Sequence, residues 1–177
     1  MRLVSVAAVA ENGVIGNDGE VPWPDLPEDV EQYRERVAGS PVILGRRTYE
    51  SMRGNLPGTA QIVVSRNVEE VADPTAVVAG GVDEAIDLAR ERLGDGTDDA
   101  VYVLGGGAIY DLFHPQVDGM ILSHIDGRYE GDTRFPEFNE ADWTVVEETE
   151  YEGFILREWR RIVPESDYAR TREADDT

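Results

Sequence analysis

The stretch "RLVSVAAVA", from Arg2 to Ala10, is almost continuously apolar. A short apolar run that is bounded by turn residues predicts a buried strand. The segment that follows, "ENGVIGNDGEVPWP", contains three glycines and predicts a loop. The first ten residues therefore predict a sheet in the interior, and the segments further along the chain indicate its type.

Strand and helix patterns alternate over the next hundred residues. Apolar residues at Leu26, Val30, Tyr33 and Val37 have helical spacing and predict one amphipathic helix. Further strands are predicted over 40–46, 60–66, 75–80 and 100–107, and further helices over 46–53, from 82 to a stop at Gly94, and over 108–115. Alternating strands and helices predict a mainly parallel sheet.

The pattern changes after Val117 to long strands without helices, over 118–129, 142–152 and 153–163. The last two suit an antiparallel hairpin that turns at 151–153. The predicted fold class is α/β, with a single twisted mixed sheet, parallel first and antiparallel at the C-terminal end, flanked by about four helices. We expect one domain over 1–162 and a disordered acidic tail over 163–177.

The charge of the chain is extreme. Sixteen basic residues, all of them arginine, stand against 37 acidic residues, which gives a net charge of −21. Such a surface repels nucleic acids and anionic membranes, so neither is an expected partner. Salt screens the self-repulsion, and we interpret the composition as adaptation to a salt-rich cytoplasm. A disordered acidic protein is excluded because 41% of the residues are hydrophobic and periodic.

The counts of cysteine and histidine, and the absence of long apolar segments, exclude further classes of protein. The 177 residues include no cysteine and only two histidines, so no disulfide or thiolate metal site is expected, and no metal site is predicted. Neither a membrane span nor a signal peptide is recognisable, and the expectation is a soluble cytoplasmic monomer.

The segment "VPWPDLPEDVEQY", Val21 to Tyr33, holds four carboxylates within seven residues. On a helical projection Asp29 lies about 70° from the centre of the apolar stripe, whereas Glu28 lies about 170° from it. Asp29 is therefore the acid at the margin of the stripe. It either interacts with the helix dipole or binds a ligand beside an aromatic wall, and the projection leaves both open.

These residues carry a family resemblance. "WPDLPEDVEQY" resembles the dihydrofolate reductase pattern Trp-Pro-x-Leu-x-x-[Asp/Glu]-apolar-x-x-[Phe/Tyr]. The segments "VAAVAENGVIG", "GRRTYESM", "LPGTAQIVVSR", "VLGGGAIY", "SHIDGRYEGDTRFPEF" and "DWTVVEETEYEGFILREW" resemble the family in order and spacing. The resemblance extends from Arg2 to about Arg161. It implies reduction of 7,8-dihydrofolate to tetrahydrofolate with NADPH, with hydride added to C6 and a proton to N5, and it implies binding of antifolate-type small molecules.

The resemblance also implies roles at the substrate side. Asp29 matches the carboxylate that binds the pterin, Ser123 matches a supporting hydroxyl, and Trp23 matches a tryptophan near the active-site water. These three form the expected catalytic set. The residues expected to bind substrate are Val6, Ala7, Val30, Tyr33, Met52, Leu56, Leu104 and Ser123.

The cofactor residues are implied in the same way. Three glycines between a strand and a helix allow the backbone to approach a pyrophosphate, and the cluster of arginines favours NADPH over NADH. The residues expected to bind the cofactor are Ala8, Ile15, Gly16, Val21, Gly45, Arg46, Arg47, Thr48, Ser65, Arg66, Leu104, Gly106, Gly107, Ala108, Ile109 and Tyr110.

The sequence also departs from the family pattern. Thr59 stands where the family usually has an arginine that clamps the carboxylate of the folate tail, and threonine cannot make that bidentate bond. Arg53 is an alternative anchor. Ala108 and Tyr49 are smaller differences.

Two rival functions remain to be compared. One is the NADPH-dependent reductase of riboflavin biosynthesis, which shares the fold but lacks the Trp-Pro and carboxylate pattern. The other is a non-enzymatic acidic binding module, which has no need for Asp29 or for the arginine cluster.

Overall fold

The computed structural model of the chain describes residues 1–67, 70–93 and 99–162. The predicted helix stop at Gly94 and the predicted tail over 163–177 lie outside these residues.

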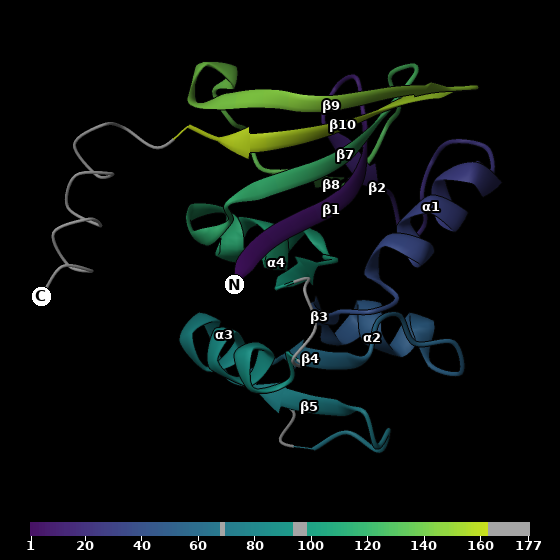
Figure 1. Cartoon of the computed structure of the whole chain (residues 1–177). Coiled ribbons are helices and arrows are strands. Elements are labelled where there is room, and N and C mark those ends of the chain that lie inside the picture. Colours follow the sequence, from purple (N-terminus) through teal and green to yellow (C-terminus); the bar gives the residue numbers. More distant parts are fainter. Residues whose placement is uncertain (68–69, 94–98, 163–177) are drawn as a thin grey trace, which may run out of the picture.

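Eight strands form one mixed sheet in the order β5-β4-β3-β6-β1-β7-β10-β9. The strands from β5 to β7 are parallel, whereas β10 pairs antiparallel with both β7 and β9 (Figure 1). The predicted α/β class, parallel first and antiparallel at the end, is confirmed. The strands are β1 Arg2–Ala10, β3 Pro41–Gly45, β4 Ala60–Val64, β5 Ala76–Ala79, β6 Ala100–Val103, β7 Gly119–Ile125, β9 Trp143–Tyr151 and β10 Phe154–Arg161.

Strand β1 lies between β6 and β7 and pairs in parallel with both. Its side chains alternate between two core clusters, because successive residues of a strand point to opposite faces. Leu3 and Val9 belong to one cluster, and Val4, Val6 and Ala10 belong to the other. The apolar run at the start of the chain is thus explained by burial on both faces of the sheet.

Four α-helices cover the two faces. Helices α1 Pro27–Val37 and α2 Arg46–Met52 contribute Val37 and Tyr49 to the cluster that holds Val6. Helices α3 Val82–Glu91 and α4 Gly107–Phe113 contribute Ala85, Ala89 and Phe113 to the other cluster. Two 3₁₀ turns, His114–Gln116 and Glu140–Asp142, complete the described helical elements.

The structure differs from the sequence prediction at several places. The strand predicted over 100–107 ends at Val103. Strands β2 Val14–Gly16 and β8 Thr133–Arg134 pair in a separate small sheet, and both are too short to give a periodic signal. Helix α3 ends at Glu91, earlier than the predicted stop. The strand predicted over 118–129 ends at Ile125.

The C-terminal hairpin carries an aromatic cluster that includes Trp143 and Trp159, with Phe138 between them. Trp159 also donates its indole N–H to Nε2 of His124 on β7, at 3.0 Å. Burial lowers the pKa of His124 to about 4, and the nearby positive charge of Arg157 acts in the same direction. His124 is therefore a neutral acceptor that joins β7 to β10.

We predict that this hydrogen bond makes stability depend on pH. The folded pKa of His124 lies below the usual value of about 6.5, so the unfolded chain binds the additional proton first. The contribution of His124 is present above pH ~6.5 and is lost as the pH falls toward ~4. A glutamine keeps an acceptor but does not titrate in this range. Denaturant unfolding of His124→Gln in molar KCl should show a smaller loss of unfolding free energy between pH 7 and pH 4.5 than the parent protein. Equal losses would contradict the prediction.

Candidate active site

Asp29 lies in the first turn of α1 and is held by two hydrogen-bond donors. The Ser123 hydroxyl on β7 and the Gln32 amide, the latter at 3.2 Å, both donate to Oδ1 of Asp29. Among the residues that the structure describes, Oδ2 accepts no hydrogen bond. The carboxylate is thus fixed through one oxygen, while the other is available to a ligand that offers N–H donors.

The rest of α1 corrects one detail of the helical projection. Val30 was placed near the centre of a buried stripe, but 54% of its surface is exposed. Val37 is the buried member of the stripe, and Leu26 and Tyr33 are only partly buried. The helix contacts the core chiefly at its C-terminal end, so its central turn leaves apolar surface beside Asp29 uncovered.

The expected substrate residues lie in two groups. Tyr33, Met52 and Leu56 are partly buried and pack on the cluster that contains Val6 and Leu104. Ala7 packs instead against the cluster on the other face of the sheet, because its side chain alternates with that of Val6. The structure therefore groups Ala7 with Ile15 and Ile109, which were expected on the cofactor side.

Tyr110 connects α4 to this region. Its hydroxyl donates to the carbonyl of Val6 at 2.6 Å. Burial, followed by the charges of Tyr33 and Asp29, raises the pKa of Tyr110. Burial is also the main reason that the pKa of Tyr33 is raised, with Arg34 opposing the shift. Tyr110 and Tyr33 are therefore neutral phenols close to Asp29.

The glycines after β6 have two different surroundings. Gly105 has φ +103, and a Cβ there would lie 2.7 Å from the Tyr110 ring. A Cβ on Gly107 would lie 2.5 Å from Thr133. Packing within the protein therefore requires both glycines. At Gly106, by contrast, the nearest atom to a Cβ is the Thr48 hydroxyl at 3.8 Å, which leaves room for a ligand to approach.

A second strand-to-helix junction lies beside these glycines. The Gly45 amide donates to the Gly105 carbonyl at 2.8 Å, which joins the end of β3 to the end of β6. Parallel pairing also sets Gly45 opposite Val64, so Arg46 and Arg47 follow one strand where Ser65 and Arg66 follow its neighbour.

The arginines at this junction differ in their partners. Arg46 pairs with Glu50 at 3.0 Å. Within the described part of the chain, the side chains of Arg47 and Arg66 make no hydrogen bond or ion pair and are exposed. Two uncompensated cations beside an open backbone suit a phosphorylated ligand.

The segment between β1 and α1 is fastened to the segment that contains β8. The side-chain amide of Asn12 donates to the Tyr129 carbonyl at 2.8 Å, and the backbone N–H of Asp18 donates to Oδ2 of Asp132 at 3.0 Å. This second bond is the main reason that the pKa of Asp132 is lowered. Trp23 is buried and packs edge-on against Tyr129. Ile15, Gly16 and Val21 belong to the same fastened segment.

Sequence reasoning missed Asn12, Tyr129 and Asp132 as residues that position this segment. The signal was present, since "SHIDGRYEGDTRFPEF" stood out as a motif, but its contacts join residues more than a hundred positions apart.

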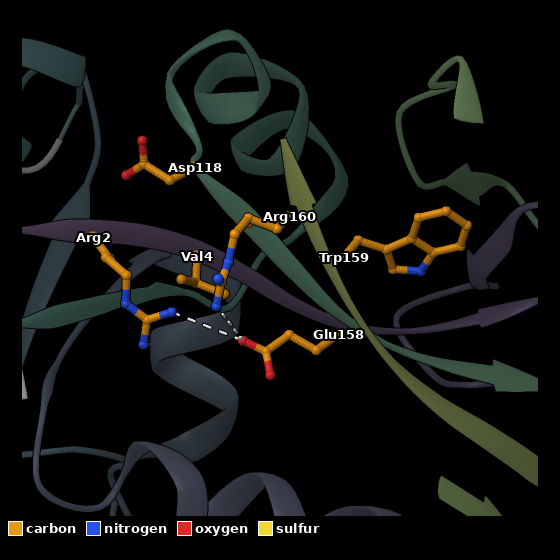
Figure 2. A pocket seen from close by; sticks show the side chains of 7 residues that line it. Arg2, Val4, Asp118, Glu158, Trp159 and Arg160 are labelled. Atoms are coloured by element: carbon orange, nitrogen blue, oxygen red, sulfur yellow. Dashed lines mark ion pairs between the residues drawn. The ribbon is translucent and has the colours of Figure 1, made fainter. Parts of the chain in front are cut away.

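Three further kinds of feature bear on function in the rest of the described structure: metal sites, membrane-spanning helices and other pockets. In the described residues no group of three or more metal-binding side chains is assembled, and no helix is long and apolar enough to cross a membrane. A small pocket lies at the amino end of β1, where Arg2 and Arg160 both point toward Glu158 (Figure 2). Ligands of open α/β sheets bind at the opposite, carboxyl ends of the strands.

Comparison with known proteins gives consistent results. The model of the dihydrofolate reductase family matches residues 2–154. Dihydrofolate reductase HdrB of Haloferax volcanii is 34% identical over 180 residues, which cover 99% of this chain and 92% of that protein. Dihydrofolate reductase 1 of Haloarcula marismortui is 38% identical over 175 residues, which cover 92% and 93% respectively.

A solved structure shows the same fold. Dihydrofolate reductase from Enterococcus faecalis, complexed with NADP(H) and RAB-propyl, has a TM-score of 0.76 and 28% identity, and the match covers 92% of this chain and 97% of that one. These matches favour dihydrofolate reduction over the riboflavin-pathway reductase and over a non-enzymatic acidic module. Together with the fixed carboxylate of Asp29 and the open backbone at Gly106, they show that the chain is an NADPH-dependent enzyme of the dihydrofolate reductase family.

Proposed function

We propose that Asp29 binds the pterin ring of dihydrofolate, and that the half-occupied carboxylate of Asp29 is the observation that carries this assignment. Ser123 and Gln32 hold Oδ1, which leaves Oδ2 to accept from the pterin, whose 2-amino group and N3 carry the N–H donors. A hydrogen bond to a charged carboxylate is shorter and roughly twice as strong as one between neutral groups. Ser123 is then a positioning residue, because it acts through Asp29.

The reaction adds a hydride to C6 and a proton to N5, and NADPH supplies the hydride when it is bound. Asp29 fixes the ring and favours its protonated form. The proton reaches N5 through water, and Trp23 lies near that water. Val30, Tyr33, Met52 and Leu56 form the apolar walls, and Val6 and Leu104 line the same side of the sheet. Ala7, on the other face of β1, contacts the substrate where the pterin meets the cofactor.

We further propose that the cofactor binds across the ends of β3, β4 and β6. Gly106 leaves room for its pyrophosphate, and Arg47 and Arg66 meet its 2′-phosphate. Arg46 contributes less, because Glu50 already pairs with it. The remaining proposed contacts are Ala8, Ile15, Gly16, Val21, Gly45, Thr48, Ser65, Leu104, Gly107, Ala108, Ile109 and Tyr110.

Salt adaptation, a cytoplasmic location and a monomeric state are also part of the proposal. The charge of −21 supports the first, because screening is needed to relieve it, and two of the matched proteins come from Haloferax volcanii and Haloarcula marismortui. The same charge opposes association between copies of the chain. Residues 1–162 are proposed as the catalytic domain.

Replacing the central carboxylate tests the assignment. Asp29→Asn should lower kcat for dihydrofolate by about 10²-fold or more, since the amide cannot favour the protonated pterin. The measurement is the loss of NADPH absorbance in molar KCl. Glu28→Gln on the outer face is the matched control and should keep the parent rate. Parent-like turnover by Asp29→Asn would exclude the assigned role.

Replacing Arg66 tests the cofactor site. Arg66→Gln should raise the KM for NADPH by about tenfold and leave the KM for NADH unchanged, because only NADPH carries the 2′-phosphate. Arg90→Gln on α3, where Arg90 contacts Asp87, provides the control. Equal changes of KM for NADPH and NADH would show that Arg66 does not bind the 2′-phosphate.

Salt adaptation predicts a specific response to ions. The Tm should rise by several degrees between dilute buffer and 1 M KCl, because the Debye length shortens from about 30 Å at 0.01 M to about 3 Å at 1 M. Sucrose at equal osmolality serves as the control for general solute effects. A Tm that rises equally in sucrose, or that does not rise in KCl, would argue against charge screening.

A further inference from the structure

The proposed reaction requires that the carboxylate of Asp29 keeps one orientation while ligands bind and leave. The following inference rests on the proposed role of Asp29 in binding the pterin. A carboxylate rotates easily about the bond that joins it to Cβ, because torsions of this kind have broad minima. Rotation would turn Oδ2 away from the pterin. The groups that limit this rotation therefore affect the affinity for the substrate.

The packing of helix α1 does not fix this orientation. Val37, at the end of the helix, is buried, whereas Val30, next to Asp29, is 54% exposed. No cation pairs with Asp29 among the described residues, and the surrounding segment 25–31 holds three other carboxylates. The orientation of Asp29 therefore depends on its two neutral hydrogen-bond donors.

These two donors come from different elements and meet at the same oxygen. Ser123, which is buried in β7, donates its hydroxyl to Oδ1 of Asp29. Gln32, about one turn further along α1, donates from Nε2 to the same atom at 3.2 Å. One donor lets the carboxylate swing about the contact, whereas two donors together with Cβ define its plane. Gln32 thus limits a rotation that Ser123 alone permits.

The side-chain amide of Gln32 has one orientation that fits its surroundings. Nε of Arg36, four residues later on the same helix, donates to Oε1 of Gln32 at 3.5 Å. A guanidinium has donors and no acceptor, so the amide oxygen faces Arg36. The amide NH₂ group then faces Asp29, whose ionised carboxylate accepts but does not donate. Arg36 and Asp29 therefore select the same orientation of Gln32.

The amide also separates a positive charge from the carboxylate. Arg36 forms no ion pair within the part of the chain that the structure describes, and Gln32 is its printed partner. A guanidinium in direct contact can make two parallel hydrogen bonds and so occupy both oxygens of a carboxylate. Through Gln32, Arg36 acts on Oδ1 of Asp29 alone, which leaves Oδ2 to the pterin.

We propose that Gln32 is a positioning residue for the reaction, and that Arg36 sets the direction of its amide. Gln32 acts through Asp29 and not on the reacting atoms. A structural role is the competing explanation, in which the three side chains only stabilise α1, since pairs at this spacing support a helix. The two explanations differ in what changes when Gln32 is replaced, either the affinity for the substrate or the stability of the protein.

The first test replaces Gln32 by an apolar residue of similar size. Gln32→Met has no donor for Asp29, so the KM for dihydrofolate should rise on the order of tenfold. The kcat and the KM for NADPH should not change, because substrate that binds a correctly turned Asp29 reacts as in the parent protein. Steady-state kinetics in molar KCl give all three values. Glu31→Gln, at the exposed neighbouring position, is the control and should keep the parent values.

Gln32→Glu separates the two explanations. Glutamate keeps a partner for Arg36, and a glutamate four residues before a basic residue supports a helix. Denaturant unfolding in molar KCl, where like charges are screened, should therefore give a free energy close to that of the parent. Because glutamate offers Asp29 no N–H, the KM for dihydrofolate should rise about as much as in Gln32→Met. A parent-like KM in Gln32→Glu would assign Gln32 a structural role.

Two further variants test the path of the effect. Arg36→Met should raise the KM for dihydrofolate about threefold, less than the loss of Gln32 itself, whereas Arg90→Met on α3 should leave it unchanged. Ser123→Ala combined with Gln32→Met leaves Oδ1 without a donor, so the KM should rise by more than the product of the two single effects. A combined effect equal to that product would mean that the two residues act on different groups.

Other outcomes overturn the inference. A parent-like KM for dihydrofolate in Gln32→Met would remove Gln32 from the site, and one in Arg36→Met would remove Arg36. Equal rises in the KM for dihydrofolate and for NADPH would indicate a general loosening of the structure. If Asp29→Asn loses activity while Gln32→Met behaves as the parent, only this inference fails. If Asp29→Asn keeps the parent activity, the proposed position of the pterin is wrong and the inference fails with it.

Discussion

The structure depends on the burial of one strand on both faces. β1 is paired on both sides, and its alternating side chains supply both core clusters, so no polar residue at Leu3 or Val4 could reach water. The same strand brings Val6 to the centre of the candidate site, where its carbonyl receives the Tyr110 hydroxyl. Because β7 is the next strand in the sheet, Ser123 comes opposite Ala8 and within reach of Asp29. The same pairing of β1 with β6 and β7 therefore both forms the core and brings the residues of the candidate site together.

Much of the fold could be predicted because its strands are apolar and its helices periodic. The eight-stranded sheet, its parallel part and the terminal hairpin all follow from patterns that local sequence carries. The small sheet of β2 and β8 could not, since two or three residues have no period and are held by distant contacts such as Asp18 with Asp132. The expected burial of Val30 was wrong for a related reason. A helical projection reveals which residues share a face, but not how much of that face another element covers.

For the site, the projection singled out Asp29 but left its role open, and the resemblance was needed to connect it with Ser123, 94 residues away, whose hydroxyl donates to it in the structure. For the glycines after β6, the sequence pattern suggested more ligand contacts than the structure supports. The pattern suggested that all three make room for a cofactor, yet Gly105 and Gly107 are already required by Tyr110 and Thr133. The same limit applies to charge. The net charge of −21 predicts a repulsive surface, but only the structure separates arginines with an acidic partner, such as Arg53, from those, such as Arg66, that have no acidic partner among the described residues.

The order of the strands also has a consequence for how the chain is made. β1 is synthesised first, yet the register joins Arg2 to Ala100 and Ala10 to Ile125. Long-range pairing of this kind slows folding, because a large loop must close before any contact compensates for the lost entropy. An apolar strand thus emerges from the ribosome with neither neighbour available, and its second neighbour is complete only when Ile125 has been translated. Nascent chains of this protein have a long interval in which the strand that later organises the enzyme is a target for chaperones or for aggregation.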